Sequence, residues 1–311
     1  MTACRTIAVA NQKGGVAKTT TVASLGAALA ELGRRVLVVD LDPQACLTFS
    51  LGLDPDTVEL SVHDVLLGRV SAGMAVHGTS EGPDLLPATI ELAGCEAMLL
   101  TKTGREYTLR AALDDVRDAY DVILLDCAPS LGVLTLNALT AADDVLVPLQ
   151  CETLSHRGVG QLLDTVQDVQ RLTNRDLQVM GVLPTLFDSR TTHAREVLAD
   201  VAGRYGLAVI EPPIAKSVRF AEAPAAGRSI LQTAGRTPGA EAYRMLARRL
   251  AGVAEPERVE EQTPVGEPER VDEHSPIAEQ RRTEESSRIE ADDVAVAADP
   301  LIDLTSQVVP S

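Results

Sequence analysis

The chain has 311 residues, of which 45% are hydrophobic and 2% aromatic, and its formal net charge is −17. This length suffices for one large α/β domain or two small ones, and a core of Ala, Val, Leu and Ile suits buried parallel strands covered by helices. Five scattered cysteines without a CxxC pair argue against a disulfide framework, and no apolar run reaches the ~18 residues of a membrane helix. We therefore expect a soluble, cytoplasmic protein without a signal peptide.

Apolar runs typical of short buried strands alternate with helical patterns through most of the chain. The predicted strands are residues 6–11, 35–40, 84–86, 121–127, 143–149, 178–186 and 208–210, and the clearest predicted helices are residues 18–32, 90–100 and 107–119. This alternation favours a doubly wound α/β fold, with a mostly parallel sheet and helices on both faces. Ligands of such folds bind at the carboxyl ends of the strands, where the motifs described next all lie.

A glycine-rich loop with the sequence KGGVAKTT, residues 13–20, follows the first predicted strand and opens a helix. Successive backbone N–H groups in such a turn form an anion site, to which the helix N-terminus adds partial positive charge. We predict that Lys18 reaches the β- and γ-phosphates of a nucleotide and that the Thr19 hydroxyl binds Mg²⁺. The common pattern GxxxxGK[ST] is not met, because Gln12 and Ala17 replace its glycines. The predicted nucleotide-binding residues are Lys13, Gly14, Gly15, Val16, Ala17, Lys18, Thr19 and Thr20.

The loop resembles the deviant Walker A box, KGGxxK[ST], of the ParA/MinD group of P-loop ATPases. Residues 5–252 are similar to the ParA/Soj proteins of that group, which segregate bacterial chromosomes and plasmids. The resemblance implies an ATP-dependent homodimer in which the front lysine, Lys13, contacts the phosphates held by the other subunit. A charge supplied in this way acts like an arginine finger, which contributes about 10³–10⁵ in rate. Lys13 and Lys18 are thus the expected catalytic lysines, and ATP and Mg²⁺ the expected cofactors.

Carboxylates follow two further strong strands, in DLDPQ at residues 40–44 and in DCAPS at residues 126–130. A strand-end carboxylate beside bound phosphates can hold Mg²⁺ or orient the attacking water. The resemblance makes these segments switch I and switch II, with Asp42 as the catalytic residue that orients water. It implies that Asp126 holds Mg²⁺ through a water and that Asp40 supports the metal region. The predicted metal site therefore comprises Thr19, Asp40 and Asp126.

The cysteine beside Asp126 raises an alternative, because the nitrogenase iron protein shares this fold and holds an iron–sulfur cluster between its subunits. Cys127 directly follows the switch II aspartate and Cys95 lies in a predicted helix, so neither the spacing nor the surroundings match. Both cysteines are better interpreted as small buried hydrophobes. A GTPase is not supported either, because no NKxD-type segment is present.

Three later segments resemble ParA/Soj segments: VPLQCE at residues 147–152, FDSRT at residues 187–191 and SVRFAEAP at residues 217–224. In Soj-type proteins, arginines at the places of Arg190 and Arg219 belong to a surface that binds double-stranded DNA without sequence preference, and Lys216 lies beside one of them. Such a surface needs only Lys and Arg spaced to meet phosphates. Residues 189–253 hold 10 Lys and Arg against 5 acidic residues, a net of +5 that permits this contact. The predicted DNA-binding residues are Arg190, Lys216 and Arg219.

The end of the chain, residues 254–311, holds 16 acidic residues against 5 arginines, a net of −11. It repeats a twelve-residue pattern, EPERVEEQTPVG followed by EPERVDEHSPIA and a decayed third copy. Such a segment cannot bury enough apolar surface to offset its ordering entropy. We therefore predict a P-loop ATPase domain over residues 1–253 and a disordered acidic tail over residues 254–311. An anionic membrane would repel this tail, unlike the basic amphipathic helix that ends MinD-type proteins.

The predicted function is that of a switch ATPase that dimerises with ATP, binds DNA nonspecifically and acts with a ParB-type partner in chromosome or plasmid segregation. Hydrolysis is expected to be slow and stimulated by the partner, and the protein to be associated with the nucleoid. The ParB-type partner rests on the family resemblance alone. The alternative is a ParA-like ATPase that positions another cellular cargo through a different adaptor.

Overall fold

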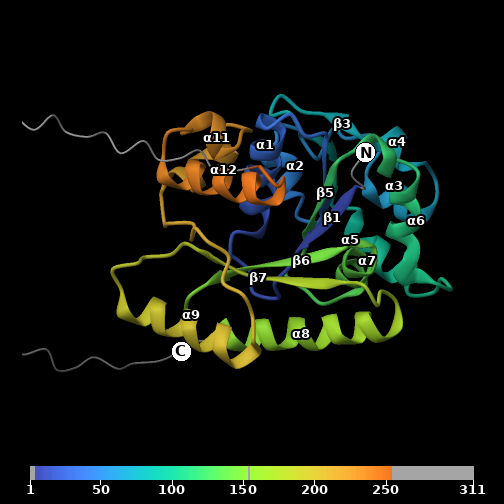
Figure 1. Ribbon diagram of the computed structural model, residues 1–311. Coiled ribbons are helices and arrows are strands. Elements are labelled where there is room, and N and C mark those ends of the chain that lie inside the picture. Colours follow the sequence, from blue (N-terminus) through green and yellow to red (C-terminus); the bar gives the residue numbers. More distant parts are fainter. Residues whose placement is uncertain (1–3, 153–154, 254–311) are drawn as a thin grey trace, which may run out of the picture. The chain divides into compact units, whose positions relative to one another are not determined.

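The computed structural model describes residues 4–152 and 155–253, and in this part of the chain seven strands form one sheet (Figure 1). Their order is β3-β4-β2-β5-β1-β6-β7, and every neighbouring pair is parallel except β3 and β4. The strands are β1 Arg5–Val9, β2 Val36–Leu41, β3 His77–Gly78, β4 Asp84–Leu86, β5 Val122–Cys127, β6 Asp144–Gln150 and β7 Gln178–Thr185. The predicted mostly parallel sheet is confirmed, whereas the predicted tail lies outside the described residues.

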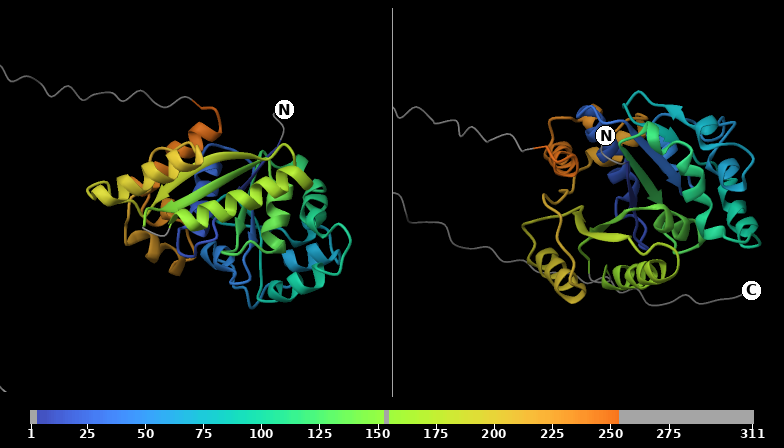
Figure 2. Two further views of the ribbon diagram at one scale, coloured as in Figure 1. Left: turned by 90° about the horizontal axis from the view of Figure 1, so that it is seen from below. Right: turned by 45° about the vertical axis from the view of Figure 1, so that its right-hand side comes forward.

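Helices cover both faces of the sheet, as the fold class requires (Figures 1 and 2). One face carries α1 Lys18–Glu31, α2 Cys46–Ser50, α10 Arg219–Ala225, α11 Ile230–Thr233 and α12 Pro238–Leu250. The other carries α3 Val62–Leu67, α4 Ala72–Ala75, α5 Leu92–Leu99, α6 Thr108–Asp114, α7 Val133–Ala141, α8 Ser155–Leu172 and α9 Thr192–Tyr205.

The alternation of side chains along β2 explains why the sheet is buried on both sides. Leu37 and Val39 pack into the core cluster beneath α3 and α7, whereas Val36 and Val38 pack into the cluster beneath α1 and α12. Successive residues of a strand point to opposite faces, so a continuous apolar run supplies both cores. The Ala, Val, Leu and Ile composition is thereby accounted for.

Local signals set the ends of several helices. Thr237 caps α12 by accepting a hydrogen bond from the amide of Ala240, and Pro238 occupies the first turn, where no amide donor is needed. Ser61 and Asp64 form a capping box at the start of α3. These caps orient the helices that pack on either face.

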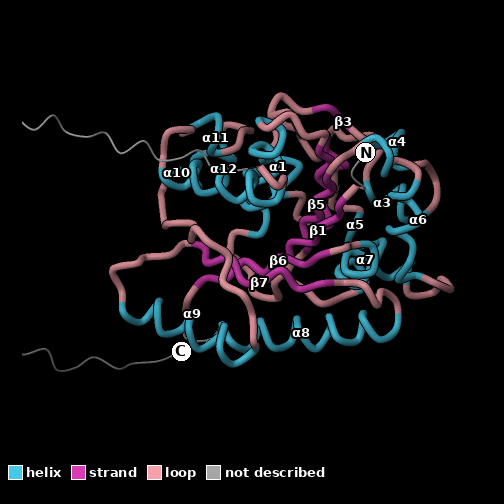
Figure 3. Tube along the Cα trace, viewed as in Figure 1, coloured by secondary structure: helices cyan, strands magenta, loops and turns pink. Residues whose placement is uncertain are grey.

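Two predicted elements are wrong in extent. Residues 208–210 form no strand but a single bridge between Val182 and Val209, because the prolines at 212 and 213 lack the amide hydrogens that a longer ladder needs (Figure 3). The helix predicted over residues 107–119 ends at Asp114, where the amide of Val116 bonds back to Leu113 and the chain tightens into a 3₁₀ turn.

The parallel register brings the predicted motifs to one edge of the sheet. Asp40 of β2 lies opposite Asp126 of β5, and Val9, which ends β1, lies opposite Asp126 on the other side. The loop after β1 therefore emerges beside both carboxylates before α1 begins at Lys18.

Candidate nucleotide-binding site

A cavity of about 940 Å³ opens at this edge, over the N-terminus of α1. The glycine-rich loop contributes part of its wall, and switch I contributes Asp42. Of the eight predicted nucleotide-binding residues, the six that line the cavity are Gly14, Gly15, Ala17, Lys18, Thr19 and Thr20. Val16 is instead buried, and its carbonyl accepts a hydrogen bond of 3.0 Å from the Thr185 hydroxyl. Val16 thus anchors the loop to β7.

The loop owes its shape to two residues with positive φ. Gly15 has a φ of 73° and Ala17, just before α1, a φ of 64°. A glycine adopts this conformation freely, whereas an alanine pays roughly 1–2 kcal/mol for it. The conformation of Ala17 explains why the common pattern has glycine at this place.

Lys18 is almost fully buried, and its Nζ donates a hydrogen bond of 3.1 Å to the carbonyl of Lys13. The lysine therefore folds back over the loop. Burial lowers the pKa of Lys18, while the charges of Asp126 and Asp42 raise it. The ammonium group thus lies in a partly desolvated position near carboxylates, where it can contact a phosphate.

Asp126 is the least satisfied polar group of the site. It is buried, and neither of its carboxylate oxygens has a hydrogen-bond partner among the described residues. The Thr19 hydroxyl lies near enough to favour the charged form, without the geometry of a hydrogen bond. Burial and the charge of Asp40 nevertheless raise the pKa of Asp126 well above its ordinary value. A buried carboxylate without a partner costs free energy unless a cation compensates it.

This donor set fits a magnesium ion of the kind that accompanies nucleotides. The described residues contain no group of three or more His, Cys, Asp and Glu side chains that would hold a metal by themselves. Nucleotide-associated Mg²⁺ needs no such group, because one or two protein oxygens, water and phosphate oxygens complete its shell. Thr19 and Asp126 would supply the protein side of that shell.

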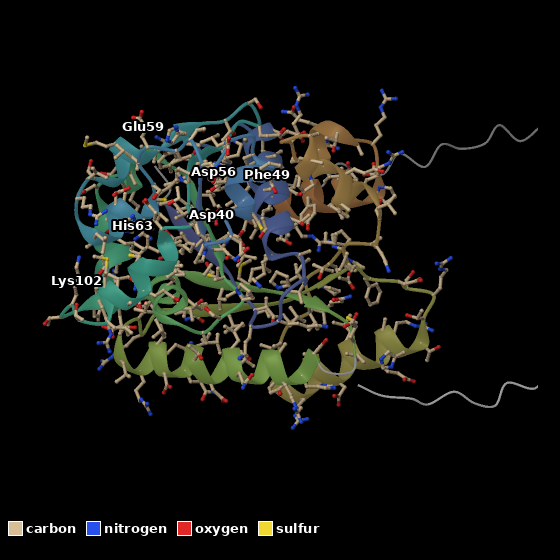
Figure 4. All side chains as sticks on the ribbon, turned by 180° about the vertical axis from the view of Figure 1, so that it is seen from behind. Asp40, Phe49, Asp56, Glu59, His63 and Lys102 are labelled. Atoms are coloured by element: carbon tan, nitrogen blue, oxygen red, sulfur yellow. The ribbon has the colours of Figure 1, made fainter. Side chains whose placement is uncertain are left out.

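Asp40, the third predicted metal residue, is engaged within switch I. Its Oδ2 accepts hydrogen bonds from the amide and hydroxyl of Thr48, at 2.9 and 2.8 Å, and its Oδ1 accepts one of 3.1 Å from the amide of Asp42. Burial raises the pKa of Asp40 to about 6, and the bonds from Thr48 and Asp42 oppose this shift. The geometry favours an indirect role, in which Asp40 holds the turn that presents Asp42. Figure 4 marks Asp40 and, in α2 beyond this turn, Phe49.

Lys13 does not line the cavity, since its Nζ pairs with Glu152 at 2.5 Å. Its backbone amide bonds to Asn11, whose own amide group donates to the carbonyl of Pro148. The front of the loop is therefore tied to the end of β6. The sequence places Glu152 at the end of a segment that resembles ParA/Soj proteins, but it assigns this glutamate no role, because the pairing with Lys13 forms only on folding.

The predicted DNA-binding residues come from two neighbouring segments. The amide of Lys216 bonds to the carbonyl of Phe187, which places the loop before α10 beside the loop after β7. Arg190 is 88% exposed, yet it binds both carboxylate oxygens of Asp188 at 3.0 Å.

Arg219 pairs in the same way with a nearby acid. Its guanidinium donates to Glu222 at 2.8 Å. Lys216 lines the nucleotide cavity, whereas Arg190 and Arg219 do not.

Further cavity residues went unpredicted. They include Cys46 and Phe49 of α2, Phe220 and Pro224 of α10, and Tyr243 of α12. Cys95 and Cys127 are buried in the core, as their interpretation as small hydrophobes requires. Burial raises the pKa of the Cys127 thiol, which keeps it protonated.

Comparison with known proteins identifies the family. A family model described as an AAA domain matches residues 4–179. The sporulation initiation inhibitor protein Soj of Bacillus subtilis is 45% identical over 246 residues, covering 79% of this chain and 97% of Soj. The chromosome partitioning protein ParA of Caulobacter vibrioides is 41% identical over 249 residues, covering 79% and 93%.

A solved structure from Mycobacterium smegmatis, described as cobyrinic acid a,c-diamide synthase with bound ADP and magnesium, is 60% identical. It superposes with a TM-score of 0.72 and covers 81% of this chain and 94% of its own. The fold, the loop and these matches define a P-loop nucleotide hydrolase with a deviant Walker A box. Within that class, the chain belongs to the ParA/Soj family. Among the described residues, none of the helices combines the length and apolar character that crossing a bilayer requires.

Proposed function

We propose that this protein is a cytoplasmic, nucleoid-associated switch that binds ATP and Mg²⁺, dimerises, binds DNA without sequence preference and is reset by hydrolysis. A ParB-type partner stimulates that hydrolysis, and the cargo is a chromosome or plasmid. The observation that carries the proposal is that Lys216 and Val218 line the same cavity as Lys18 and Thr19. A nucleotide in this cavity touches the segment that leads directly into Arg219.

The nucleotide chemistry follows from the side chains around the loop. Lys18 and the loop amides hold the phosphates, while Thr19 and Asp126 hold Mg²⁺, which neutralises charge on the β- and γ-phosphates. Asp42 is only half-buried and accepts a hydrogen bond of 3.0 Å from the amide of Gln44. Its proposed role is to orient the attacking water. Lys13 of each subunit completes the site of the other.

DNA binding is proposed to strengthen on dimerisation because phosphate contacts add across two subunits. Each neutralised phosphate releases counterions, so affinity falls steeply as salt rises. Arg190 and Arg219 are paired with Asp188 and Glu222, and DNA must displace these carboxylates. Solvent screens exposed pairs of this kind, so displacing them costs little free energy.

The name of the M. smegmatis relative suggests a second reaction, the amidation of two carboxyl groups of cobyrinic acid. Coverage is similar for the three relatives, at 94% for the synthase and at 97% and 93% for Soj and ParA. We favour the switch because the nucleotide cavity includes Lys216 and Val218, which lead into Arg219. An assay of ATP hydrolysis that depends on cobyrinic acid and ammonia separates the two. The other alternative, a ParA-like ATPase for a different cargo, shares the whole cycle except the adaptor.

The test is steady-state ATP hydrolysis by the full chain, alone, with duplex DNA, with a candidate ParB-type protein, and with both. A slow basal rate that rises when both are present supports the proposal. A rate that responds to neither contradicts the partition role and directs attention to another adaptor. A rate that responds only to cobyrinic acid and ammonia supports the synthase.

A further inference from the structure

Glu152 is held firmly beside the front of the P-loop. Its Oε2 lies 2.5 Å from Nζ of Lys13, and its Oε1 accepts a hydrogen bond of 2.6 Å from the side-chain amide of Gln150. The backbone amide of Glu152 also bonds to the carbonyl of Gln150 at 2.9 Å. Both carboxylate oxygens are therefore engaged, and one of them is engaged by Lys13.

The frame behind this ion pair is rigid. Asn11 accepts a bond of 3.0 Å from the amide of Lys13 and donates one of 2.7 Å to the carbonyl of Pro148 in β6. A Cβ atom added to Gly158 of α8 would lie 3.1 Å from the side-chain oxygen of Asn11, so the helix closes over this link. The ends of β1 and β6 thus hold Lys13 and Glu152 at a fixed separation.

We propose that Glu152 acts as a latch that holds Lys13 within its own subunit until a nucleotide-loaded partner competes for it. The inference rests on the proposed function, because it concerns the lysine that crosses the dimer interface. One ammonium group cannot lie 2.5 Å from Glu152 and also contact phosphates of another subunit. Closing the dimer therefore requires that each of the two latches opens.

The ion pair between Lys13 and Glu152 is weak enough for a bound nucleotide to break, yet strong enough to weaken dimerisation measurably. Lys13 and Glu152 have side chains that are 31% and 55% exposed, so water screens their attraction. An exposed pair of this kind favours its closed form by about 1.4- to 5-fold, and two pairs per dimer raise the dissociation constant by about 2- to 30-fold. The phosphates of a bound nucleotide carry more charge than one carboxylate, and they therefore compete successfully with Glu152 for the ammonium group of Lys13.

The experiment compares Glu152→Gln with wild type in the full chain. The dimer dissociation constant is measured by sedimentation with a non-hydrolysable ATP analogue and Mg²⁺. As a second readout, the rate at which an amine-reactive reagent modifies Lys13 in the nucleotide-free protein is measured by peptide mass spectrometry. Asp168→Asn serves as a matched control, because it removes one exposed carboxylate that pairs with Arg171 on α8. Circular dichroism verifies that each variant is folded.

We expect Glu152→Gln to lower the dissociation constant by about 2- to 30-fold, and Asp168→Asn to leave it unchanged. In nucleotide-free protein, Glu152→Gln should also speed the modification of Lys13, whereas Asp168→Asn should not, a difference that general charge repulsion would not give. An unchanged or weakened dimer overturns the latch, as does a tighter dimer without faster modification of Lys13. Wild-type protein that forms no nucleotide-dependent dimer contradicts the proposed function itself, so the two failures are distinguishable.

Discussion

The hydroxyl groups of Thr21 and Tyr243 lie 3.0 Å apart in the core, although 222 residues separate them in the chain. Thr21 follows the P-loop in α1, and Tyr243 belongs to α12 and lines the nucleotide cavity. The Tyr243 ring meets Phe220 edge-on, with centroids 6.1 Å apart. The last described helix thereby connects the helix of the P-loop with the helix that begins at Arg219.

Tyr243→Phe should lower the free energy of unfolding by about 1–3 kcal/mol, because it leaves the buried Thr21 hydroxyl without its partner. Urea denaturation of the nucleotide-free protein measures the change. Adding Thr21→Val should recover part of the loss, since removing both polar partners costs less than removing one. A double variant less stable than the sum of the single changes would contradict this account.

Asp126→Asn should stabilise the nucleotide-free protein while abolishing Mg²⁺-dependent hydrolysis. A carboxyl group whose pKa is raised by folding binds more protons when folded, so stability falls as pH rises from 3.8 through its raised pKa. Each unit of that rise corresponds to about 1.4 kcal/mol lost at high pH. The asparagine variant should therefore gain stability relative to wild type as the pH rises above 3.8.

Urea denaturation in EDTA at several pH values measures the pH effect, and phosphate release measures hydrolysis. Asp168→Asn is the control, since Asp168 is exposed and pairs with Arg171 on the surface. If the free energy of unfolding of Asp126→Asn depends on pH as that of wild type does, Asp126 is not the group whose raised pKa destabilises the protein.

The parts of the site that the sequence predicts are those with a motif at the end of a strand. The glycine-rich loop, Asp40 and Asp126 each follow a buried apolar run, and the parallel register then places them together. Glu152 and Tyr243 could not be found in this way. Each is a common residue that meets its partner only through folding, across 139 and 222 residues.

The errors in the predicted strands also arise because local sequence does not determine how each segment pairs. The apolar run at residues 208–210 has the composition of a strand, but the two prolines that follow it, at 212 and 213, limit its pairing to one bridge. The antiparallel edge strand β3 has two residues, His77 and Gly78, too few for a periodic signal.

Cys46 should be alkylated by iodoacetamide, and ATP with Mg²⁺ should slow the reaction several-fold. The thiol is exposed and lines the nucleotide cavity beside Asp42. Partial burial, and then the charge of Asp42, raise its pKa, so the rate should still be increasing with pH at pH 9. Peptide mass spectrometry measures the ratio of labelling at Cys46 to that at Cys4, which does not line the cavity and serves as the internal reference. Equal protection of both thiols would point to a global change instead.

Glu222→Gln should tighten DNA binding by about 1.4- to 5-fold, because it releases Arg219 from an exposed ion pair. Arg219→Ala should weaken binding for every duplex sequence and reduce the slope of log affinity against log salt by about 1. Fluorescence anisotropy with two duplexes of unrelated sequence, in the presence of a non-hydrolysable ATP analogue, measures both effects. Asp168→Asn makes the same change of charge on α8 and controls for net charge. If that control tightens binding as much as Glu222→Gln does, the gain comes from the overall charge of the protein, and Arg219 has no special place on the DNA surface.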